Sequence, residues 1–135
     1  MDVRLKAFSE ALASLSYLTE VDMAALAVHL DKRLIDALDN GKAQKFEYTL
    51  ELCWKAIKVA LKEQEGIDEA SPKKVVKAWY LAGHLAEDDY LALLAAIDDR
   101  NKLSHIYDAE EFMAIVARLP AYARLMQRVN ETLNC

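Results

Sequence analysis

The chain has 135 residues, enough for one core to bury about 68% of the surface of the unfolded chain, so we expect a single domain over residues 1–135. Its 17 Lys and Arg residues against 22 Asp and Glu residues give a net charge of -5, which excludes a global field that attracts nucleic acid or an anionic membrane. Three glycines and two prolines leave few breaks among strong helix formers, and no segment alternates with a period of two residues, so the expected class is all-α.

The cysteines and the N-terminal residues indicate the compartment. Cys53 and Cys135 are far apart, and neither is spaced with a histidine as in a metal site, so we expect free thiols, a reducing compartment and no metal. The first residues include Asp2, Arg4 and Lys6 where a signal peptide requires an apolar core, and no apolar run approaches the length of a membrane span. We therefore expect a cytoplasmic protein with no membrane partner and no cofactor.

The first 38 residues hold two sets of apolar residues in different helical phases. The first set steps by three and four residues along one helical face: Leu5, Phe8, Leu12 and Leu15. The second set follows after a change of phase: Met23, Leu26, Leu30, Leu34 and Ala37. Thr19 and Asp22, which lie between the sets, resemble a capping box that would divide residues 3–38 into two helices. Because no Gly or Pro supports that break, a single helix is favoured, and the alternative stays open.

A turn and a second long helix are expected next. The segment Asp39-Asn40-Gly41 is a turn signal, since Asn and Gly tolerate positive φ and Asp can bond to its own backbone. Beyond it, apolar residues recur on one face until Gly66 ends the helix: Phe46, Leu50, Cys53, Ile57 and Leu61. Trp54 is expected in the core beside this stripe, as is Trp79 further along the chain, and Glu51 and Lys55 form a favourable i,i+4 pair on the flank of the stripe.

Capping residues delimit the remaining helices. Ser71 followed by Pro72 predicts the start of a short helix, and Gly83 lies just past its last turn. Residues 87–104 predict a further helix, and Asp108 is a good N-cap for the last one. The last helix carries an apolar seam that steps alternately by three and four residues: Phe112, Ile115, Leu119, Tyr122, Met126, Val129 and Leu133.

Together these elements predict four long helices and one short connector helix, arranged as an up-and-down four-helix bundle. No internal repeat or low-complexity tract is visible in the sequence. The apolar seams exceed what a monomer needs to form its core, so we expect a homodimer.

The stretch from residue 98 to residue 108 holds the side chains best suited to chemistry. Within eight residues it supplies a permanent cation, an amide, a group that titrates near neutrality and a phenol: Arg100, Asn101, His105 and Tyr107. Steps of three and four residues continue the apolar face of the preceding helix through Asn101 and His105, so we expect both to point inward. Arg100 is expected at the edge of that face.

These residue types suit the cleavage of RNA by its own 2′-hydroxyl. His105 can act as acid or base, Arg100 can hold a phosphate through its fork of donors, and Asn101 can orient either group. This reaction requires no metal, and a dimer that brings two copies together would supply a second proton-transfer group. A structural account also stays open, in which the three residues only close the end of a helix.

Three sequence blocks point to a family: QKFEYTLELCWK at residues 44–55, SPKKVV at residues 71–76 and DRNKLSHIYD at residues 99–108. With these blocks, in this order, the chain resembles the nucleotidyltransferase substrate-binding proteins, which belong to the HEPN group (higher eukaryotes and prokaryotes nucleotide-binding). Two departures are visible. Cys53 stands where the family has a small residue, and the first 40 residues are longer than the family pattern leads us to expect.

The resemblance implies a HEPN-like four-helix bundle that dimerises and forms a complex with a small nucleotidyltransferase encoded beside it. Toxin ribonucleases of the wider group carry a signature of Arg, a polar residue and His, which corresponds here to Arg100, Asn101 and His105. In one branch the partner adds AMP to a Tyr two residues after the His, here Tyr107, and silences the toxin. A bulky anionic adduct at that position would block the phosphate site.

Two functions and one structural role remain open at this point. The expected function is a metal-independent endoribonuclease toxin that acts on RNA and is silenced by a cognate minimal nucleotidyltransferase through AMP addition to Tyr107. The alternative is a non-catalytic subunit that presents a substrate to the nucleotidyltransferase. The structural role is a helical dimer whose motif closes a helix end. The acidic composition disfavours broad RNA binding, whereas the intact motif favours catalysis.

Overall fold

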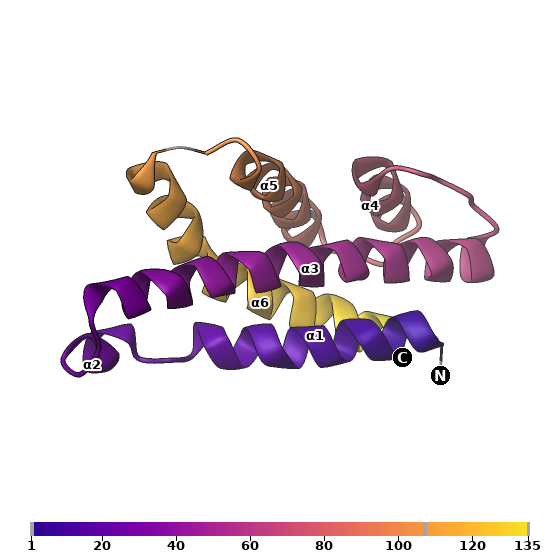
Figure 1. The fold of residues 1–135 in the computed structure, drawn as a ribbon. Helices are drawn as coiled ribbons and strands as arrows, with labels where there is room; N and C mark the ends of the chain where they lie inside the picture. The colour runs from indigo at the N-terminus through magenta and orange to yellow at the C-terminus, as the bar shows by residue number, and fades with distance from the viewer. Residues whose placement is uncertain (1, 107, 135) are drawn as a thin grey trace.

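The computed structural model describes residues 2–106 and 108–134. Within these residues the chain forms six α-helices and no β-strand, which confirms the all-α class. Figure 1 shows them: α1 (Val3–Thr19), α2 (Met23–Ala27), α3 (Lys32–Glu65), α4 (Pro72–Leu81), α5 (Glu87–Leu103) and α6 (Ala109–Leu133). Four of these helices are long, as expected. The two short ones, α2 and α4, connect them, whereas the sequence predicted a single short connector.

The long helix α3 is the element around which the others pack. It contacts each of the other five helices, and α6 contacts α1, α3 and α5. In Figure 1, α1 runs along one side of α3, while α4 and α5 lie on the other side. The end of α5, which carries Arg100 and Asn101, therefore lies on the side of α3 that faces away from α1.

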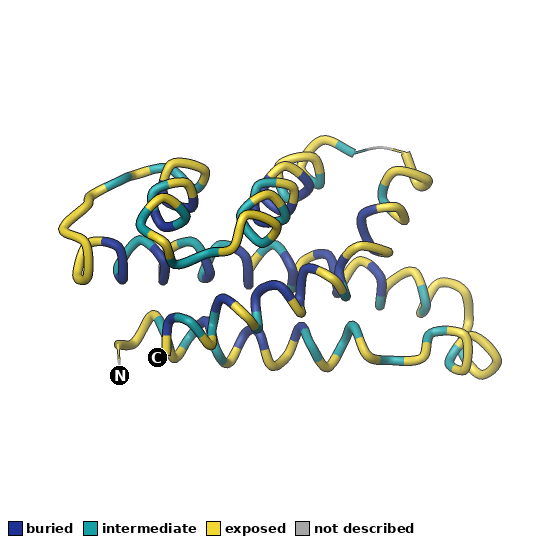
Figure 2. The backbone as a smooth tube through the Cα atoms, turned by 180° about the vertical axis from the view of Figure 1, so that it is seen from behind, coloured by how far each residue is buried: buried dark blue, intermediate teal, exposed yellow. Residues whose placement is uncertain are grey.

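The core forms where these helices face one another, as the buried positions in Figure 2 show. Every helix except α2 contributes large side chains that are fully buried, among them Phe8, Leu15, Phe46, Leu50, Trp79, Leu93, Leu119 and Met126. Trp79 is in the core, as predicted, whereas Trp54 is half-buried and only packs against the core. Burial of this apolar surface is the main term that holds the bundle together.

The favoured interpretation of residues 3–38 as one helix is wrong. Helix α1 ends at Thr19, and the next two helices each begin after an aspartate cap. Asp22 accepts a hydrogen bond from the backbone N–H of Ala25 at 3.0 Å, and Asp31 accepts one from that of Arg33 at 2.7 Å. Such caps satisfy the backbone donors that a helix start leaves unpaired, so a helix can begin without Gly or Pro nearby.

The expected turn at Asp39-Asn40-Gly41 is also wrong, because α3 continues through it. Asp39 is only 7% exposed and forms an ion pair with the equally buried Lys42, whose Nζ lies 3.8 Å from Oδ1 of Asp39. The Nδ2 of Asn40 donates to the carbonyl of Asp36 at 2.8 Å, one helical turn back. The buried face of α3 continues in phase from Asp39 into the core, so tertiary packing outweighs the local turn preference.

Other helix ends agree with the sequence. Helix α3 ends at Glu65 and is capped by Gly66, whose φ of 68° lies in the left-handed region, and Gly83 has a φ of 91° just after α4. Pro72 is the first residue of α4, and Asp108 accepts a hydrogen bond from the backbone N–H of Glu110 at the start of α6. The predicted helix over residues 87–104 corresponds to α5.

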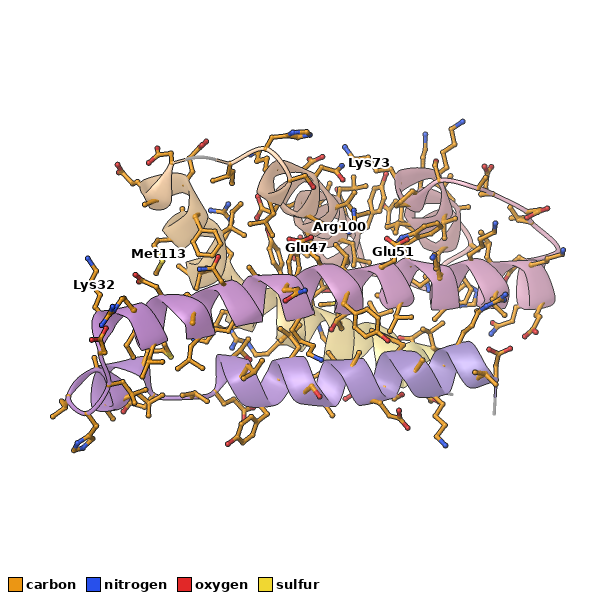
Figure 3. The ribbon with its side chains drawn as sticks, in the orientation of Figure 1. Lys32, Glu47, Glu51, Lys73, Arg100 and Met113 are labelled. Atoms are coloured by element: carbon orange, nitrogen blue, oxygen red, sulfur yellow. The ribbon has the colours of Figure 1, made fainter. Side chains whose placement is uncertain are left out.

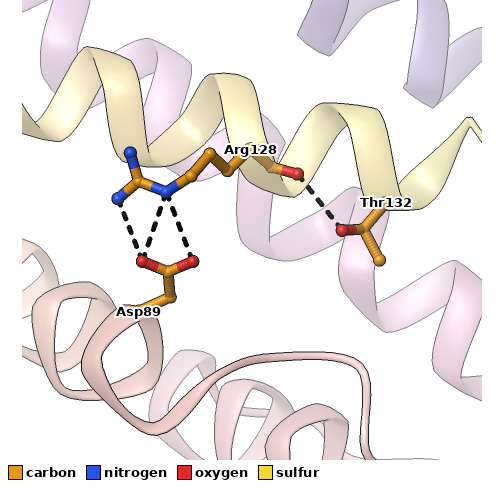
Figure 4. A network of polar contacts seen from close by, with 3 residues as sticks. All are labelled: Asp89, Arg128 and Thr132. Atoms are coloured by element: carbon orange, nitrogen blue, oxygen red, sulfur yellow. Dashed lines mark hydrogen bonds and ion pairs between the residues drawn. The ribbon is translucent and has the colours of Figure 1, made fainter.

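A polar contact joins the start of α5 to the end of α6, as Figure 4 shows. The Nη2 of Arg128 lies 2.9 Å from Oδ1 of Asp89, and its Nε lies 3.3 Å from both carboxylate oxygens. One turn further along α6, Thr132 donates to the carbonyl of Arg128 at 3.2 Å. This contact ties the beginning of α5 to α6, at the opposite end of α5 from the candidate residues.

Candidate functional site

A buried carboxylate holds the end of α5 against α6. Asp99 is 4% exposed and accepts hydrogen bonds from Nε of Arg118 at 2.8 Å, from Nη2 of Arg118 at 3.0 Å and from the hydroxyl of Tyr122 at 2.6 Å. Burial raises the pKa of Asp99, but the bonds from Arg118 and Tyr122 outweigh it and hold that pKa below its ordinary value. Burial and the adjacent Asp99 raise the pKa of Tyr122 to about 12. This network fixes the rotation of α5 and hence where its neighbouring residues point.

Arg100, the next residue, points toward α3. In Figure 3 it faces Glu51, and its Nη2 lies 3.3 Å from Oε2 of that residue. Both side chains are about one-third exposed, at 35% for Arg100 and 32% for Glu51. The Nε of Arg100 is buried and has no hydrogen-bond partner among the residues that the structure describes. Among the described residues, the recorded ion pair of this guanidinium is the one between its Nη2 and Glu51.

Glu51 gathers three donors on α3 and α5. Besides Arg100, the indole N–H of Trp54 donates to its Oε2 at 3.0 Å, and Nζ of Lys55 lies 3.2 Å from its Oε1. The last of these is the i,i+4 pair that the sequence predicts. Burial raises the pKa of Glu51, but the hydrogen bonds from Trp54 and Lys55 and the charge of Arg100 bring it below its ordinary value. Glu51 is thus a stable anion beside Arg100.

Asn101 and His105 are exposed, and the expectation that both point inward is wrong. The buried face of α5 runs through Leu93, Ala96 and Ile97 to Asp99, and the interhelical bonds of Asp99 turn the following residues toward solvent. Asn101 and His105 instead line an open depression of about 510 Å³. The other residues that line it are Asp98, Lys102, Ile106 and Glu111.

The structure thus brings together two of the three residues predicted to be catalytic. Asn101 and His105 share the depression, whereas Arg100 leaves α5 toward Glu51 and does not line it. Tyr107, the predicted modification target, lies outside the described residues. Within the described part of the chain, no side chain of the three donates to a helix carbonyl, whereas Arg100 lies in the last turn of α5, where a cation interacts favourably with the helix dipole.

Sequence reasoning missed several residues around this depression. Asp98 lies three residues before Asn101, and Lys102 lies three residues before His105, so continuing the 3.6-residue period would have found both. Asp98 also forms an ion pair with Lys73 of α4, its Oδ1 lying 2.6 Å from Nζ. Glu111 comes from the first turn of α6, and no local signal relates it to His105.

Three further observations concern thiols, metals and membranes. The thiol of Cys53 is free and buried, as expected for that residue, and Cys135 lies outside the described residues. Among the described residues, no group of three or more His, Cys, Asp and Glu side chains is placed to hold a metal ion. No helix in the described part of the chain combines the length and the apolar character needed to cross a bilayer.

Comparisons with known proteins agree on fold and family. A family model described as nucleotidyltransferase substrate binding protein like matches residues 3–135, which includes residues 3–40 of the N-terminal segment noted above as longer than expected. A crystal structure of a protein from Thermus thermophilus is 34% identical, covers 95% of this chain and 99% of its own, and has a TM-score of 0.82. A structure from Haemophilus influenzae, described as revealing the fold of a substrate binding domain of a nucleotidyltransferase, is 26% identical with a TM-score of 0.82, over 97% of this chain and 99% of that one. No curated protein matches the sequence.

Proposed function

The chain belongs to the family of nucleotidyltransferase substrate-binding proteins, and from this membership we propose that it partners a minimal nucleotidyltransferase and is itself a metal-independent endoribonuclease of a toxin–antitoxin pair. The proposed catalytic residues are Arg100, Asn101 and His105. Membership of the wider HEPN group is part of this proposal and rests on the sequence signature.

The observation that best supports the proposal is that the Arg100 guanidinium makes fewer contacts than those of Arg118 and Arg128 on α6. Arg118 binds Asp99 through two nitrogens, and Arg128 binds Asp89 through two nitrogens, as arginines with a structural role do. Arg100 has one ion pair at 3.3 Å and a buried Nε without an acceptor within the described residues. A buried donor without a partner has a cost in free energy, which a phosphate oxygen would remove once the side chain turns to expose this nitrogen. This is the arginine that the signature assigns to the phosphate.

The proposed chemistry at the depression is transesterification within RNA. His105 removes the proton of a 2′-hydroxyl, whose oxygen attacks the adjacent phosphorus while the 5′-oxygen of the next nucleotide leaves. The products are a 2′,3′-cyclic phosphate and a free 5′-hydroxyl. The side chain of His105 is exposed and can reach a strand that lies across the depression. Asn101, one helical turn before His105, can orient the imidazole or a phosphate oxygen.

We propose further that two copies of the chain complete the site. Within one copy Arg100 points toward α3 and His105 lines the depression, so the two side chains do not converge on one phosphate. A two-fold axis near the end of α5 would bring Arg100 of one copy toward His105 of the other. The same arrangement would place a second histidine where it can return the proton to the leaving oxygen, a role that water can fill more slowly when that histidine is absent.

The proposed regulation acts at Tyr107, which lies outside the described residues. Tyr107 follows His105 by two residues, so AMP added to its hydroxyl would stand next to the depression. The adduct would exclude RNA by its volume and by the negative charge of its phosphate. We assign this modification to the cognate nucleotidyltransferase.

A second candidate function is a non-catalytic subunit that presents a substrate to the nucleotidyltransferase. Two carboxylates favour it, because Asp98 and Glu111 line the same depression as His105 and would repel a phosphate. Glu51 is an anion that competes with RNA for Arg100. The printed description of the Haemophilus influenzae structure also refers to substrate binding rather than to cleavage.

The test is cleavage of end-labelled total tRNA by the purified protein in excess EDTA. The preparation is first shown by mass to be unmodified at Tyr107. We expect cleavage by the parent and by His29→Ala, which removes an exposed histidine outside the site, and none by His105→Ala. Absence of cleavage by folded, unmodified parent protein would favour the non-catalytic subunit instead.

A mixing experiment tests the two-copy site. His105→Ala and Arg100→Ala are each expected to be inactive alone, whereas a mixture that has exchanged subunits contains one site with both residues intact. Regained cleavage in the mixture supports the two-copy site. A mixture that stays inactive, although mass spectrometry detects the mixed dimer, contradicts it.

A further inference from the structure

A second cavity lies where the start of α1, the latter half of α3 and the loop after α3 meet. Its volume is about 510 Å³, and it is more recessed than the depression beside His105. Seven residues line it: Arg4, Trp54, Lys55, Lys58, Val59, Lys62 and Asp68. It shares no residue with the depression at the end of α5, and neither the motif nor the proposed function uses it.

The cavity concentrates positive charge in a chain of net charge -5. Four of its seven lining residues are cations, and Asp68 is the one carboxylate among them. Lys55 is paired with Glu51, but the side chains of Arg4, Lys58 and Lys62 have no ion-pair partner among the described residues. Like charges one helical turn apart, such as Lys58 and Lys62, destabilise a helix. A bound anion would offset this repulsion and turn an unfavourable cluster into a binding site.

An aromatic ring of fixed orientation stands beside these cations. Trp54 lines the cavity, and the hydrogen bond from its indole N–H to Glu51 at 3.0 Å sets the direction of the ring. Val59 adds an apolar side chain to the same wall. The Nζ of Lys55 lies over the Trp54 ring, 6.0 Å from its centroid, so the ring already holds a cation at its face. A planar base that carries phosphates can displace this flexible lysine and stack on the ring while its phosphates meet the neighbouring cations.

We propose that this cavity binds a nucleoside di- or triphosphate, with the phosphates on Arg4, Lys58 and Lys62 and the base against Trp54. The cavity volume falls within the range of about 300–1000 Å³ typical of small-molecule sites. Inorganic phosphate has no apolar group that could contact the ring of Trp54, so it would not account for that side of the cavity. An RNA strand would need an extended basic surface, which a recessed cavity in an acidic chain does not offer.

The inference does not depend on the ribonuclease proposal. Nucleotide binding at this cavity needs neither His105 nor Asn101, so either proposal can fail while the other stands. The two places are nevertheless joined through Glu51, which contacts Trp54 in the cavity wall and Arg100 on α5.

The experiment is calorimetric titration of the purified full chain with ATP, ADP and inorganic triphosphate at low ionic strength. The test variant is Lys58→Gln with Lys62→Gln. Its matched control is Lys74→Gln with Lys77→Gln, which removes two exposed lysines three residues apart on α4, outside the cavity. We expect saturable binding of ATP by the parent and the control, and binding weaker by about tenfold or more in the test variant, since charge-assisted contacts to phosphate are lost.

Trp54→Leu tests whether the base is recognised. We expect ATP to bind about fivefold to a hundredfold more weakly to this variant, the loss that removal of one stacking partner produces. Inorganic triphosphate should bind the variant as it binds the parent, which also shows that the variant is folded.

Three outcomes would overturn the proposal. The first is no saturable binding of ATP to the parent. The second is an equal loss in the test and control lysine variants, which would indicate a response to net charge alone. The third is equal affinity for ATP and inorganic triphosphate, unchanged by Trp54→Leu, which would leave an anion site without a nucleoside.

Discussion

The Nη2 of Arg100 lies 3.3 Å from Oε2 of Glu51, the same oxygen that accepts the indole N–H of Trp54 at 3.0 Å. The carboxylate of Glu51 on α3 therefore contacts both Arg100 of the candidate site and Trp54, which lines the cavity proposed to bind a nucleotide. Neither contact is visible in the motif itself, because Glu51 and Arg100 belong to helices that α4 separates in the sequence.

The first prediction concerns how much the ion pair between Glu51 and Arg100 contributes to the free energy of unfolding. Because both side chains are about one-third exposed, a double-mutant cycle of Glu51→Gln and Arg100→Gln should give a coupling energy below about 1 kcal/mol. The measurement is urea unfolding of the parent, the two single variants and the double variant. A coupling energy of about 2 kcal/mol or more would make Arg100 a structural residue and remove the main support for its role on a phosphate.

The second prediction compares two adjacent aspartates of α5. Asp99→Asn should lower the free energy of unfolding by about 2–4 kcal/mol, because it weakens three hydrogen bonds to a buried carboxylate. Asp98→Asn should lower it by less than about 1 kcal/mol, since its ion pair with Lys73 is half exposed. Urea unfolding at pH 7 measures both, and similar values for the two variants would contradict the network as the anchor of α5.

The third prediction is a pH dependence that belongs to Asp99. Its pKa is lower in the folded chain than in the unfolded one, so its stabilisation is complete above the ordinary carboxyl value of about 4 and is lost as pH falls through the folded value. The difference in unfolding free energy between the parent and Asp99→Asn should stay constant from pH 7 to pH 5 and shrink below about pH 4. A difference that stays the same down to pH 3 would show that the carboxylate is not favoured by folding.

The fourth prediction concerns the alkaline range. The pKa of Tyr122 is raised to about 12, above the value of an unfolded tyrosine, so its stabilisation is complete below about pH 10 and is lost as pH rises toward 12. Spectrophotometric titration at 295 nm should show one tyrosine of the six that ionises last, and Tyr122→Phe should remove that step. If the late step persists in Tyr122→Phe, another tyrosine is responsible.

The fifth prediction compares Gly41, which lies within α3, with Gly66, which caps the C-terminal end of that helix. Gly41 lies within the helix with nothing within 4 Å of an added Cβ, so Gly41→Ala should stabilise the protein by about 0.5–1 kcal/mol. Gly66 has a φ of 68° at the helix end, so Gly66→Ala should destabilise it by about 1 kcal/mol. Thermal unfolding of both variants gives the signs, and destabilisation by Gly41→Ala would place a turn, not a helix, at that position.

Local signals in the sequence predicted the parts of the fold that depend on a few neighbouring residues. Gly66, Gly83 and Asp108 end or begin helices because backbone conformation and capping are decided within one turn. The apolar stripe from Phe46 to Leu61 is buried as its period predicts. A local signal gave a wrong prediction at Asp39-Asn40-Gly41. The turn preference of these residues opposes the buried face of a long helix, and the helix continues through them.

The same distinction between local signals and tertiary contacts applies to the candidate site. The sequence by itself determined that Arg100, Asn101 and His105 stand at the end of a helix, in blocks that identify the family. Only the tertiary structure decided that Asn101 and His105 are exposed while Arg100 faces Glu51, because the bonds from Arg118 and Tyr122 to Asp99 set the rotation of α5. Helical periodicity fixes which residues share a face, but contacts between distant helices choose which face is buried.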